Sequence, residues 1–259
     1  MDDISRYNRE RWDALVRANV EFSRPWLDLD EAKARARVDP EGMMGDVAGR
    51  DVLCLAAGGG QQSAAFGLLG ARVTVLDLSD EQLGRDAEAA RHYGLDVRTI
   101  QGDMRDLSNF PDGSFDLVWQ AHSINFVPDA LAVFSEVARV LRPGGRYRLE
   151  YTNPFLHGAW RNWDGTGYAL TLPYEDGEYV DPDPEWNVCD TDGTLRRVEG
   201  PREFRHRLST VVNGMIARGF AILGMWEGDG NGDPAAEPGS WNHFESIVPP
   251  WLTLWTARR

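Results

Sequence analysis

Apolar segments that read as strands alternate with segments of helical periodicity through the middle of the chain. Ser79 with Gln82 resembles a capping box at the start of one such helix, and Gly94 is typical of its end. Strands that alternate with helices pair in parallel, so the pattern predicts a doubly wound α/β sheet. The predicted strands cover residues 52–57, 72–76, 97–100, 115–119 and 146–151, and the predicted helices cover 61–69, 80–93 and 129–141.

The segments on either side of this core follow other patterns. Residues 4–37 show apolar side chains at helical spacing up to a break at Arg24-Pro25-Trp26, which predicts a helical cap. Residues 153–201 are rich in Trp, Tyr, Asp, Gly and Pro, and we interpret them as an inserted β-hairpin lid. After a predicted helix at 204–218, strands are expected at 220–226 and 251–257. Because residues 228–248 lack a helical pattern, these two strands are expected to pair antiparallel.

The length of 259 residues suits one α/β domain with elaborations. We expect a seven-stranded, Rossmann-like, doubly wound sheet that is mostly parallel, with its last strand antiparallel. A single domain would then consist of a helical cap (1–48), a cofactor-binding core (49–152), an inserted lid (153–201) and a last helix with the strand pair (202–259).

The formal net charge of −14 disfavours nucleic acid and anionic membranes as partners. The N-terminal residues lack the apolar segment of a secretory signal, and no run approaches the length of a membrane span, so we expect a cytoplasmic protein. Cys54 lies within an apolar strand and is interpreted as a reduced, buried thiol. No set of His, Cys and carboxylate residues has the spacing of a metal site.

A glycine turn, Ala57-Gly58-Gly59-Gly60-Gln61, directly follows the first predicted strand. Its peptide N–H groups and the start of the next helix could hold a carboxylate or a phosphate. Asp77 ends the second strand, nineteen residues after Gly58, where a nucleoside ribose would need an acceptor. Together these features indicate an adenosine cofactor.

Further polar and apolar residues follow the second, third and fourth strands, at the edge where a doubly wound sheet binds its ligand. Leu78 is placed to pack on an adenine face. Asp103 could accept from the exocyclic amine of adenine, while Met104 closes the ring slot. After the fourth strand comes a polar and aromatic segment, residues 120–126.

In their order and spacing, these motifs resemble those of the class I S-adenosylmethionine-dependent methyltransferases, in particular the small-molecule branch labelled type 11. The resemblance implies that Gly58 and Gly60 line the methionine part of the cofactor, that Asp77 binds the ribose hydroxyls and that Asp103 with Met104 holds adenine. The motifs are Leu53-Cys-Leu-Ala-Ala-Gly-Gly-Gly60, Val75-Leu-Asp-Leu-Ser79, Gly102-Asp-Met104, Ser114-Phe-Asp-Leu-Val118 and Val140-Leu-Arg-Pro-Gly-Gly145. The cofactor site predicted in this way comprises Ala57, Gly58, Gly60, Gln61, Asp77, Leu78, Asp103, Met104, Gln120 and Ala121.

Two positions depart from that family. It usually has an acidic residue where this sequence has Cys54 and a glycine where it has Ala56, so the usual hold on the methionine ammonium is either missing or replaced from elsewhere. Tyr7, Trp12 or Gln61 could compensate. The rival cofactor, a nicotinamide dinucleotide, would require a third glycine near Ser63, which is absent.

Methyl transfer is an in-line displacement at a sulfonium carbon, and alignment alone can lower its barrier by roughly 7–11 kcal/mol. A general base is needed only where the acceptor loses a proton, and His122 and His206 are the candidates. The attacking atom, oxygen, nitrogen, sulfur or carbon, stays open. A protein that binds S-adenosylmethionine without transferring methyl is the alternative. The predicted substrate contacts are Tyr7, Trp12, Ser123, Asn125, Phe126 and Trp160.

The aromatic residues of the insertion allow two interpretations. They form either a small satellite core or a lid that keeps water from an apolar or cationic acceptor. These residues are Trp160, Trp163, Tyr168, Tyr174, Tyr179 and Trp186.

Overall fold

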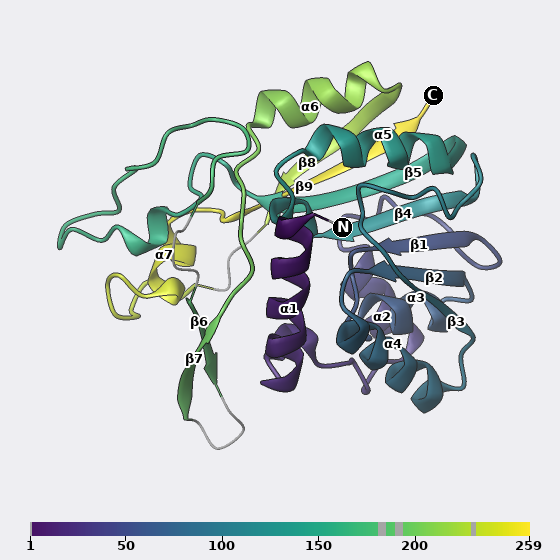
Figure 1. Cartoon of the computed structure of the whole chain (residues 1–259), viewed down its shortest axis with the longest axis horizontal. Helices are drawn as coiled ribbons and strands as arrows, with labels where there is room; N and C mark the ends of the chain where they lie inside the picture. Colours follow the sequence, from purple (N-terminus) through teal and green to yellow (C-terminus); the bar gives the residue numbers. More distant parts are fainter. Residues whose placement is uncertain (1, 181–184, 190–193, 229–231) are drawn as a thin grey trace.

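The computed structural model describes residues 2–180, 185–189, 194–228 and 232–259. One seven-stranded sheet has the order β3-β2-β1-β4-β5-β9-β8 (Figure 1). Strands β1 to β5 pair in parallel, and β9 lies antiparallel between β5 and β8, so the predicted sheet is confirmed. The strands are β1 (Asp51–Leu55), β2 (Arg72–Asp77), β3 (Val97–Gln101), β4 (Phe115–Ala121), β5 (Leu141–Thr152), β8 (Phe220–Glu227) and β9 (Trp251–Arg258).

Helices cover both faces of this sheet (Figure 1). Side chains along β1 alternate between two apolar cores: Leu53 packs with α5 and α6, and Cys54 packs with α2, α3 and α4. This alternation is what a sheet buried on both faces requires. The helices are α1 (Asp3–Arg17), α2 (Glu31–Val38), α3 (Gln62–Leu68), α4 (Asp80–Tyr93), α5 (Ala130–Val140), α6 (Leu208–Ala217) and α7 (Trp241–Ile247), with 3-10 turns η1 (Glu21–Ser23), η2 (Ser123–Phe126) and η3 (Ala159–Arg161).

Helix α4 has the bounds that the sequence predicts, 80–93. The Ser79 side chain accepts from the Gln82 amide, and Gly94 ends the helix with φ of 68°. The capping box is only half formed, because the Ser79 amide donates to Asp77 and the Gln82 side chain is turned elsewhere.

Three predictions were wrong. Strand β5, expected at 146–151, already begins at Leu141 and runs to Thr152. The helix expected at 204–218 begins at Leu208, and Phe204 before it pairs with Tyr179 in an isolated bridge. The connection 228–248, expected to lack a helix, contains α7, whose first turn is capped by the Ser240 side chain. Seven residues make about two turns, too few for helical spacing of apolar residues to repeat clearly.

The insertion contains the predicted hairpin, formed by β6 (Glu185–Cys189) and β7 (Leu195–Glu199) in antiparallel register. Residues 181–184 and 190–193 of the predicted lid lie outside the described residues. In Figure 1 the hairpin projects away from the sheet, on the side where α1 stands. The division into a cap, core, lid and tail within one domain stays a prediction.

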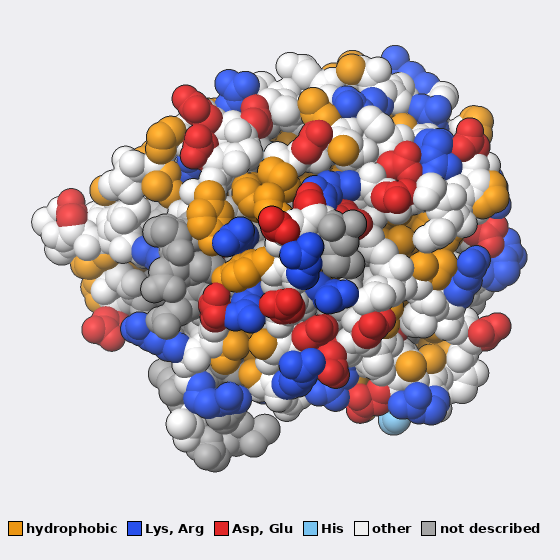
Figure 2. Space-filling view, in the orientation of Figure 1, with side chains coloured by type: hydrophobic (Ala, Val, Ile, Leu, Met, Phe, Trp, Pro, Cys, Tyr) orange, Lys and Arg blue, Asp and Glu red, His pale blue; other side chains and the backbone are white. Residues whose placement is uncertain are grey.

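On the face shown in Figure 2, Lys and Arg side chains are interspersed with Asp and Glu. Some charged side chains of the protein are paired across elements, as Arg17 of α1 is with Glu81 of α4 at 3.2 Å. Within the described ranges, no helix has both the length and the apolar composition to cross a bilayer.

Candidate active site

The glycine turn joins β1 to α3 and lies against α4. Gly59 and Gly60 have φ of 115° and 72°, and a side chain at Gly60 would clash with the Arg85 carbonyl oxygen, so glycine is required here. Ala56 opens the turn with φ of 46°, at the position where the resembling family has glycine. A left-handed conformation costs a residue with a Cβ about 1–2 kcal/mol. Contacts between the turn and the rest of the protein therefore have to offset this conformational cost at Ala56.

The three glycine amides are bonded inside the protein. Gly58 donates to Asp77 at 2.9 Å, and Gly59 and Gly60 donate to Asp86 at 3.2 and 3.1 Å. Asp86 is a fully buried residue of α4. A dinucleotide binds its pyrophosphate through free amides at such a turn. Because a buried carboxylate already occupies them, this geometry disfavours the dinucleotide alternative.

Asp77 lies at the carboxyl end of β2 and keeps acceptor capacity for a ligand. Its oxygens accept the backbone amides of Gly58 and Ser79, both at 2.9 Å, and the Leu78 amide also hydrogen-bonds to this carboxylate. Burial raises the pKa of Asp77 to about 6. Nearby, the buried Gln82 Oε1 has no partner, and it faces Gly59. The Asp77 carboxylate can accept a further hydrogen bond, and the Gln82 amide oxygen beside Gly59 has no partner. Together these two acceptors fit a ribose diol.

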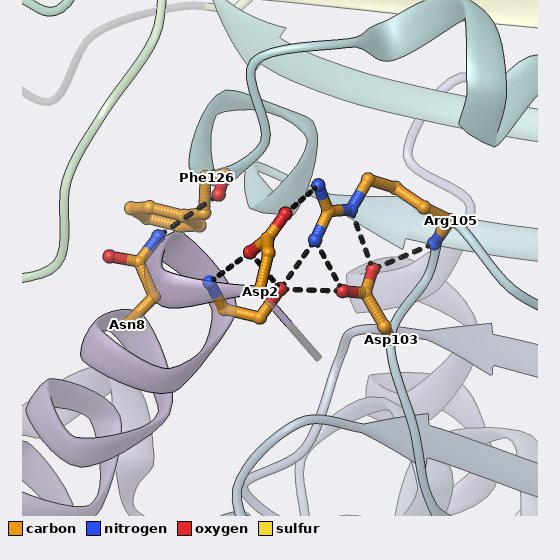
Figure 3. A network of polar contacts seen from close by, with 6 residues as sticks. Asp2, Asn8, Asp103, Arg105 and Phe126 are labelled. Carbon is orange, nitrogen blue, oxygen red and sulfur yellow. Dashed lines mark hydrogen bonds and ion pairs between the residues drawn. The ribbon is translucent and has the colours of Figure 1, made fainter.

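Asp103 is engaged by helix α1 (Figure 3). Its Oδ1 accepts from the backbone amide and Nε of Arg105 at 2.9 and 3.0 Å, and its Oδ2 contacts Arg105 and the Ser5 hydroxyl at 2.6 and 2.7 Å. Burial favours the neutral acid, but the bonds from Arg105 and Ser5 outweigh it and lower the pKa of Asp103. All four acceptor positions are filled, so an adenine amine would have to displace Ser5 or Arg105.

Helix α1 lies along the carboxyl edge of the sheet (Figure 1). Besides the Ser5 contact, the Asp13 carboxylate lies 2.6 Å from the Ser79 hydroxyl after β2. The Asn8 side chain donates at 2.9 Å to the carbonyl of Phe126 after β4 (Figure 3). One helix therefore covers the ends of three strands where the cofactor is expected.

The three residues expected to compensate for Cys54 make other contacts: Tyr7 and Trp12 lie on α1, and Gln61 lies at the start of α3. The Tyr7 hydroxyl donates to Glu199 of β7 at 2.6 Å, and Trp12 packs edge-on against Phe126, with ring centroids 5.1 Å apart. The Gln61 side chain donates to the Arg24 carbonyl at 3.0 Å. The structure instead brings Asp86 close to the buried Cys54, whose pKa is raised by burial and by that neighbouring charge.

A buried polar network underlies the end of β4. Gln120 accepts from the Tyr147 hydroxyl at 2.6 Å and donates to Ser123 at 2.9 Å, and its amide also lies 3.3 Å from the Met104 sulfur. These contacts place Met104 beside β4. Among the other predicted cofactor residues, Ala57 is buried, and Leu78 and Ala121 are half-buried.

His122 follows β4 and is paired with a carboxylate on β5. Its Nε2 lies 2.7 Å from Glu150 Oε1, and its ring contacts Trp251, with ring centroids 4.0 Å apart. Burial raises the pKa of Glu150, but His122 and Arg148 outweigh this effect and hold it well below its usual range. The His122 Nδ1 atom is buried and unpartnered. The pair matches a histidine base oriented by an acid.

His206 is only 1% exposed and lies in the extended segment before α6. Its Nε2 lies 3.0 Å from the Ile124 carbonyl oxygen of η2, and burial lowers its pKa. Asn125 also fixes η2, since its side chain accepts from the Thr152 amide at 3.1 Å and donates to the Phe204 carbonyl at 3.3 Å. Both residues therefore support the loop that carries His122.

The aromatic residues of the insertion belong to several contact groups. Trp160 packs edge-on against Trp241, which in turn contacts Trp251 beside His122. Trp186 of the hairpin packs against Trp12 of α1. The remaining pairs are Trp163 with Tyr168, Tyr174 with Phe155 and Tyr179 with Phe204. Trp160 reaches the His122 pair through Trp241, and Trp163 with Tyr168 reaches it through Phe244 and the same Trp241.

Three residues of this site were not identified from the sequence. Asp86 lies three positions after Leu83, on the buried face of α4. A charged residue on the apolar face of a helix is the sequence feature that could have identified it. Glu150 sits two residues after Arg148 near the end of a buried strand. Arg105 had no such signal. Among the described residues, no group of three His, Cys, Asp or Glu side chains could hold a metal ion.

The chain is similar to known methyltransferases in sequence and in structure. Residues 53–149 match the family described as a methyltransferase domain. An uncharacterized methyltransferase of Bacillus subtilis, YbaJ, is 34% identical over 243 residues, which cover 89% of this chain and 92% of that protein. A ubiquinone biosynthesis O-methyltransferase of Xanthomonas oryzae is 35% identical over 139 residues, 49% of this chain and 56% of that protein. The crystal structure of an S-adenosylmethionine-dependent methyltransferase from Mesorhizobium loti superposes with a TM-score of 0.59 at 22% identity, covering 90% of this chain and all of that one.

Proposed function

Because this chain belongs to the S-adenosylmethionine-dependent methyltransferase family, with S-adenosylmethionine as its cofactor, we propose that it methylates a small molecule held beside His122. The observation that carries the proposal is the 2.7 Å pairing of His122 with Glu150 at the carboxyl ends of β4 and β5. The relative named for ubiquinone biosynthesis supports a small acceptor.

The cofactor residues are assigned from their position at the carboxyl edge. Asp77 would bind the ribose hydroxyls, since a carboxylate accepts about four hydrogen bonds and the amides of Gly58, Ser79 and Leu78 account for three. Asp103 and Met104 would hold adenine once the Ser5 hydroxyl has moved away from Asp103. Gly58 and Gly60 would lie along the methionine part. When bound, the cofactor supplies an activated methyl group on a positively charged sulfur.

His122 would take the proton that the acceptor loses. With the Nε2 proton donated to Glu150, the lone pair is on Nδ1, the atom that has no protein partner. Glu150 is itself fixed by Arg148 at 2.7 Å and by the Thr253 hydroxyl at 3.1 Å, so the ring is held in one orientation. His206 would act indirectly, by positioning η2 through Ile124.

The acceptor would lie beside His122 and along the tryptophans next to it. Trp251 and Trp241 with Trp160 form a continuous aromatic wall from β9 through α7 to η3. Such a wall excludes water and suits an aromatic or a cationic acceptor. Ser123, Asn125 and Phe126 would complete the site from η2, and Tyr7 and Trp12 from α1.

Turnover tests this proposal. The purified protein is incubated with S-adenosylmethionine and a panel of phenols, amines and thiols, and formation of S-adenosylhomocysteine is measured. His122→Asn should lower kcat by about 10²–10⁴ for an acceptor that loses a proton. His92→Asn, a change at an exposed histidine of α4, is the control. Tight cofactor binding without turnover of any acceptor would favour a protein that binds without transferring methyl. Full activity of His122→Asn would remove the proposed base.

A further inference from the structure

The carboxylate that is absent from the end of β1 is supplied by another element. Cys54 stands where the resembling family has an acid, and it is buried among apolar side chains of β1 and the helices behind it. Asp86 of α4 is fully buried close to it. We propose that Asp86 is the positioning residue that shapes the glycine turn for the methionine part of the cofactor, in place of the missing acid. The inference rests on the proposed cofactor site.

The hydrogen bonds of Asp86 account for its position. One oxygen accepts from the Gly60 amide at 3.1 Å and from the Ser63 hydroxyl at 2.5 Å, and the other accepts from the Gly59 amide at 3.2 Å. Helix α3 has no side-chain cap of its own at its N-terminus. Asp86 therefore satisfies donors of the turn and of the first turn of α3 at once, from a different helix.

A buried charge without a nearby cation is costly unless it is hydrogen-bonded, and Asp86 accepts from the Gly59 and Gly60 amides and the Ser63 hydroxyl. Burial raises the pKa of Asp86 to about 7, and the neighbouring Asp77 contributes to this rise. Asp86 therefore lies behind the glycine turn, and Asp77 lies next to the turn at the end of β2. Their negative potential favours a ligand that carries positive charge on the other side of the turn, as the sulfonium and ammonium groups of S-adenosylmethionine do.

Asp86 does not need to touch the cofactor to act in this way. The turn backbone lies between them, because the amides of Gly59 and Gly60 point toward α4. Asp86 would thus fix the peptide orientation at Gly58 to Gly60 and leave the opposite side of the turn for the ligand. Removal of its charge should affect the methionine end of the site more than the adenosine end.

The test is a double-mutant cycle at positions 54 and 86, with affinities measured by calorimetry. Asp86→Asn should weaken S-adenosylhomocysteine binding at least tenfold but change adenosine affinity less than threefold. Cys54→Asp should also weaken binding, because it places a second carboxylate beside Asp86. The variant that combines both changes returns one acid to the turn, and it should bind within about threefold of wild type.

Glu88→Gln, on the exposed side of the same helix, is the matched control and should leave all affinities unchanged. Thermal unfolding by circular dichroism checks each variant. If Asp86→Asn does not fold, the test depends on the variant that combines it with Cys54→Asp. Recovery of folding and of binding by that variant would support the inference that Asp86 replaces an acid at position 54. A folded Asp86→Asn with unchanged affinity, or a double variant as weak as the product of both losses, would overturn the inference. If wild type itself fails to bind S-adenosylmethionine and S-adenosylhomocysteine, the proposed function fails as well.

Discussion

The imidazole of His122 and the carboxylate of Glu150 lie 2.7 Å apart across the carboxyl ends of neighbouring parallel strands. His122 reaches this position through a left-handed backbone, with φ of 50°, which is uncommon for a residue other than glycine. Its own amide donates to the Glu150 carbonyl at 2.8 Å, so backbone and side chain are both tied to β5. Such strain is maintained where the surrounding structure fixes it, often at functional sites.

Replacement of Glu150 by Gln should lower kcat about tenfold and leave the KM for the cofactor within threefold of wild type. The amide keeps the shape of the carboxylate but removes the negative charge that holds the Nε2 proton and stabilises a protonated ring. The split between kcat and KM distinguishes the role, because a carboxylate that orients the base affects kcat and leaves cofactor binding unchanged. A variant with an unchanged kcat would show that Glu150 is structural.

Asp77→Ala should weaken S-adenosylmethionine binding more than tenfold. Hydrogen bonds to a charged group contribute about 1.5–3 kcal/mol each, so loss of one ribose contact already suffices. Asp80→Ala, an exposed acid in the first turn of the same helix that follows β2, is the control and should bind normally. Calorimetric affinities compare the two. An unchanged dissociation constant for Asp77→Ala would refute the ribose assignment.

Two glycines near the turn should respond to alanine in opposite ways. A Cβ at Gly58 would lie 2.7 Å from Gln82 Cβ and 3.0 Å from an Asp77 oxygen, so Gly58→Ala should destabilise the fold by about 1–3 kcal/mol and abolish cofactor binding. Gly84 lies in α4 with open space around its Cβ position. Gly84→Ala should stabilise the protein by about 0.5–1 kcal/mol. Chemical denaturation measures both, and equal effects would contradict the packing described for Gly58.

The sequence predicts the sheet well because each strand is a short apolar run with a clear boundary. The two ends of α4, capped by Ser79 and Gly94, are likewise determined by residues that are close in sequence. The polar contacts of the site depend on residues far apart in the chain, and local patterns carry no information about them. Ser5 meets Asp103 across 98 positions, and Glu150 meets His122 through strand pairing. Helix α7 was missed for another reason, since it is too short to show periodicity.

Ser5→Ala should increase cofactor affinity about twofold to tenfold and speed association. In the structure the Ser5 hydroxyl fills one acceptor position of Asp103, which adenine would otherwise use (Figure 3). The α1 contacts from Asn8 and Asp13 remain, so the helix should stay in place. Stopped-flow fluorescence and calorimetry test this, with Ser114→Ala as a surface control. Weaker binding by Ser5→Ala would mean that this hydroxyl supports the site rather than competing for it.

Asp86 should make the stability of the cofactor-free protein depend on pH. Burial raises its pKa to about 7 in the folded state, against 3.8 in the unfolded chain, so the folded state binds a proton more tightly between these values. Stability should therefore fall as pH rises from about 4 to 7 and level off above 7. Asp86→Asn lacks this contribution. Between pH 5 and 8 the free energy of unfolding of the wild type should fall by about 2–3 kcal/mol relative to that of Asp86→Asn. This loss corresponds to roughly 4–12 °C in Tm. Both proteins share every other titrating group. Parallel curves of Tm against pH would therefore show that the pKa of Asp86 is not raised in the folded state.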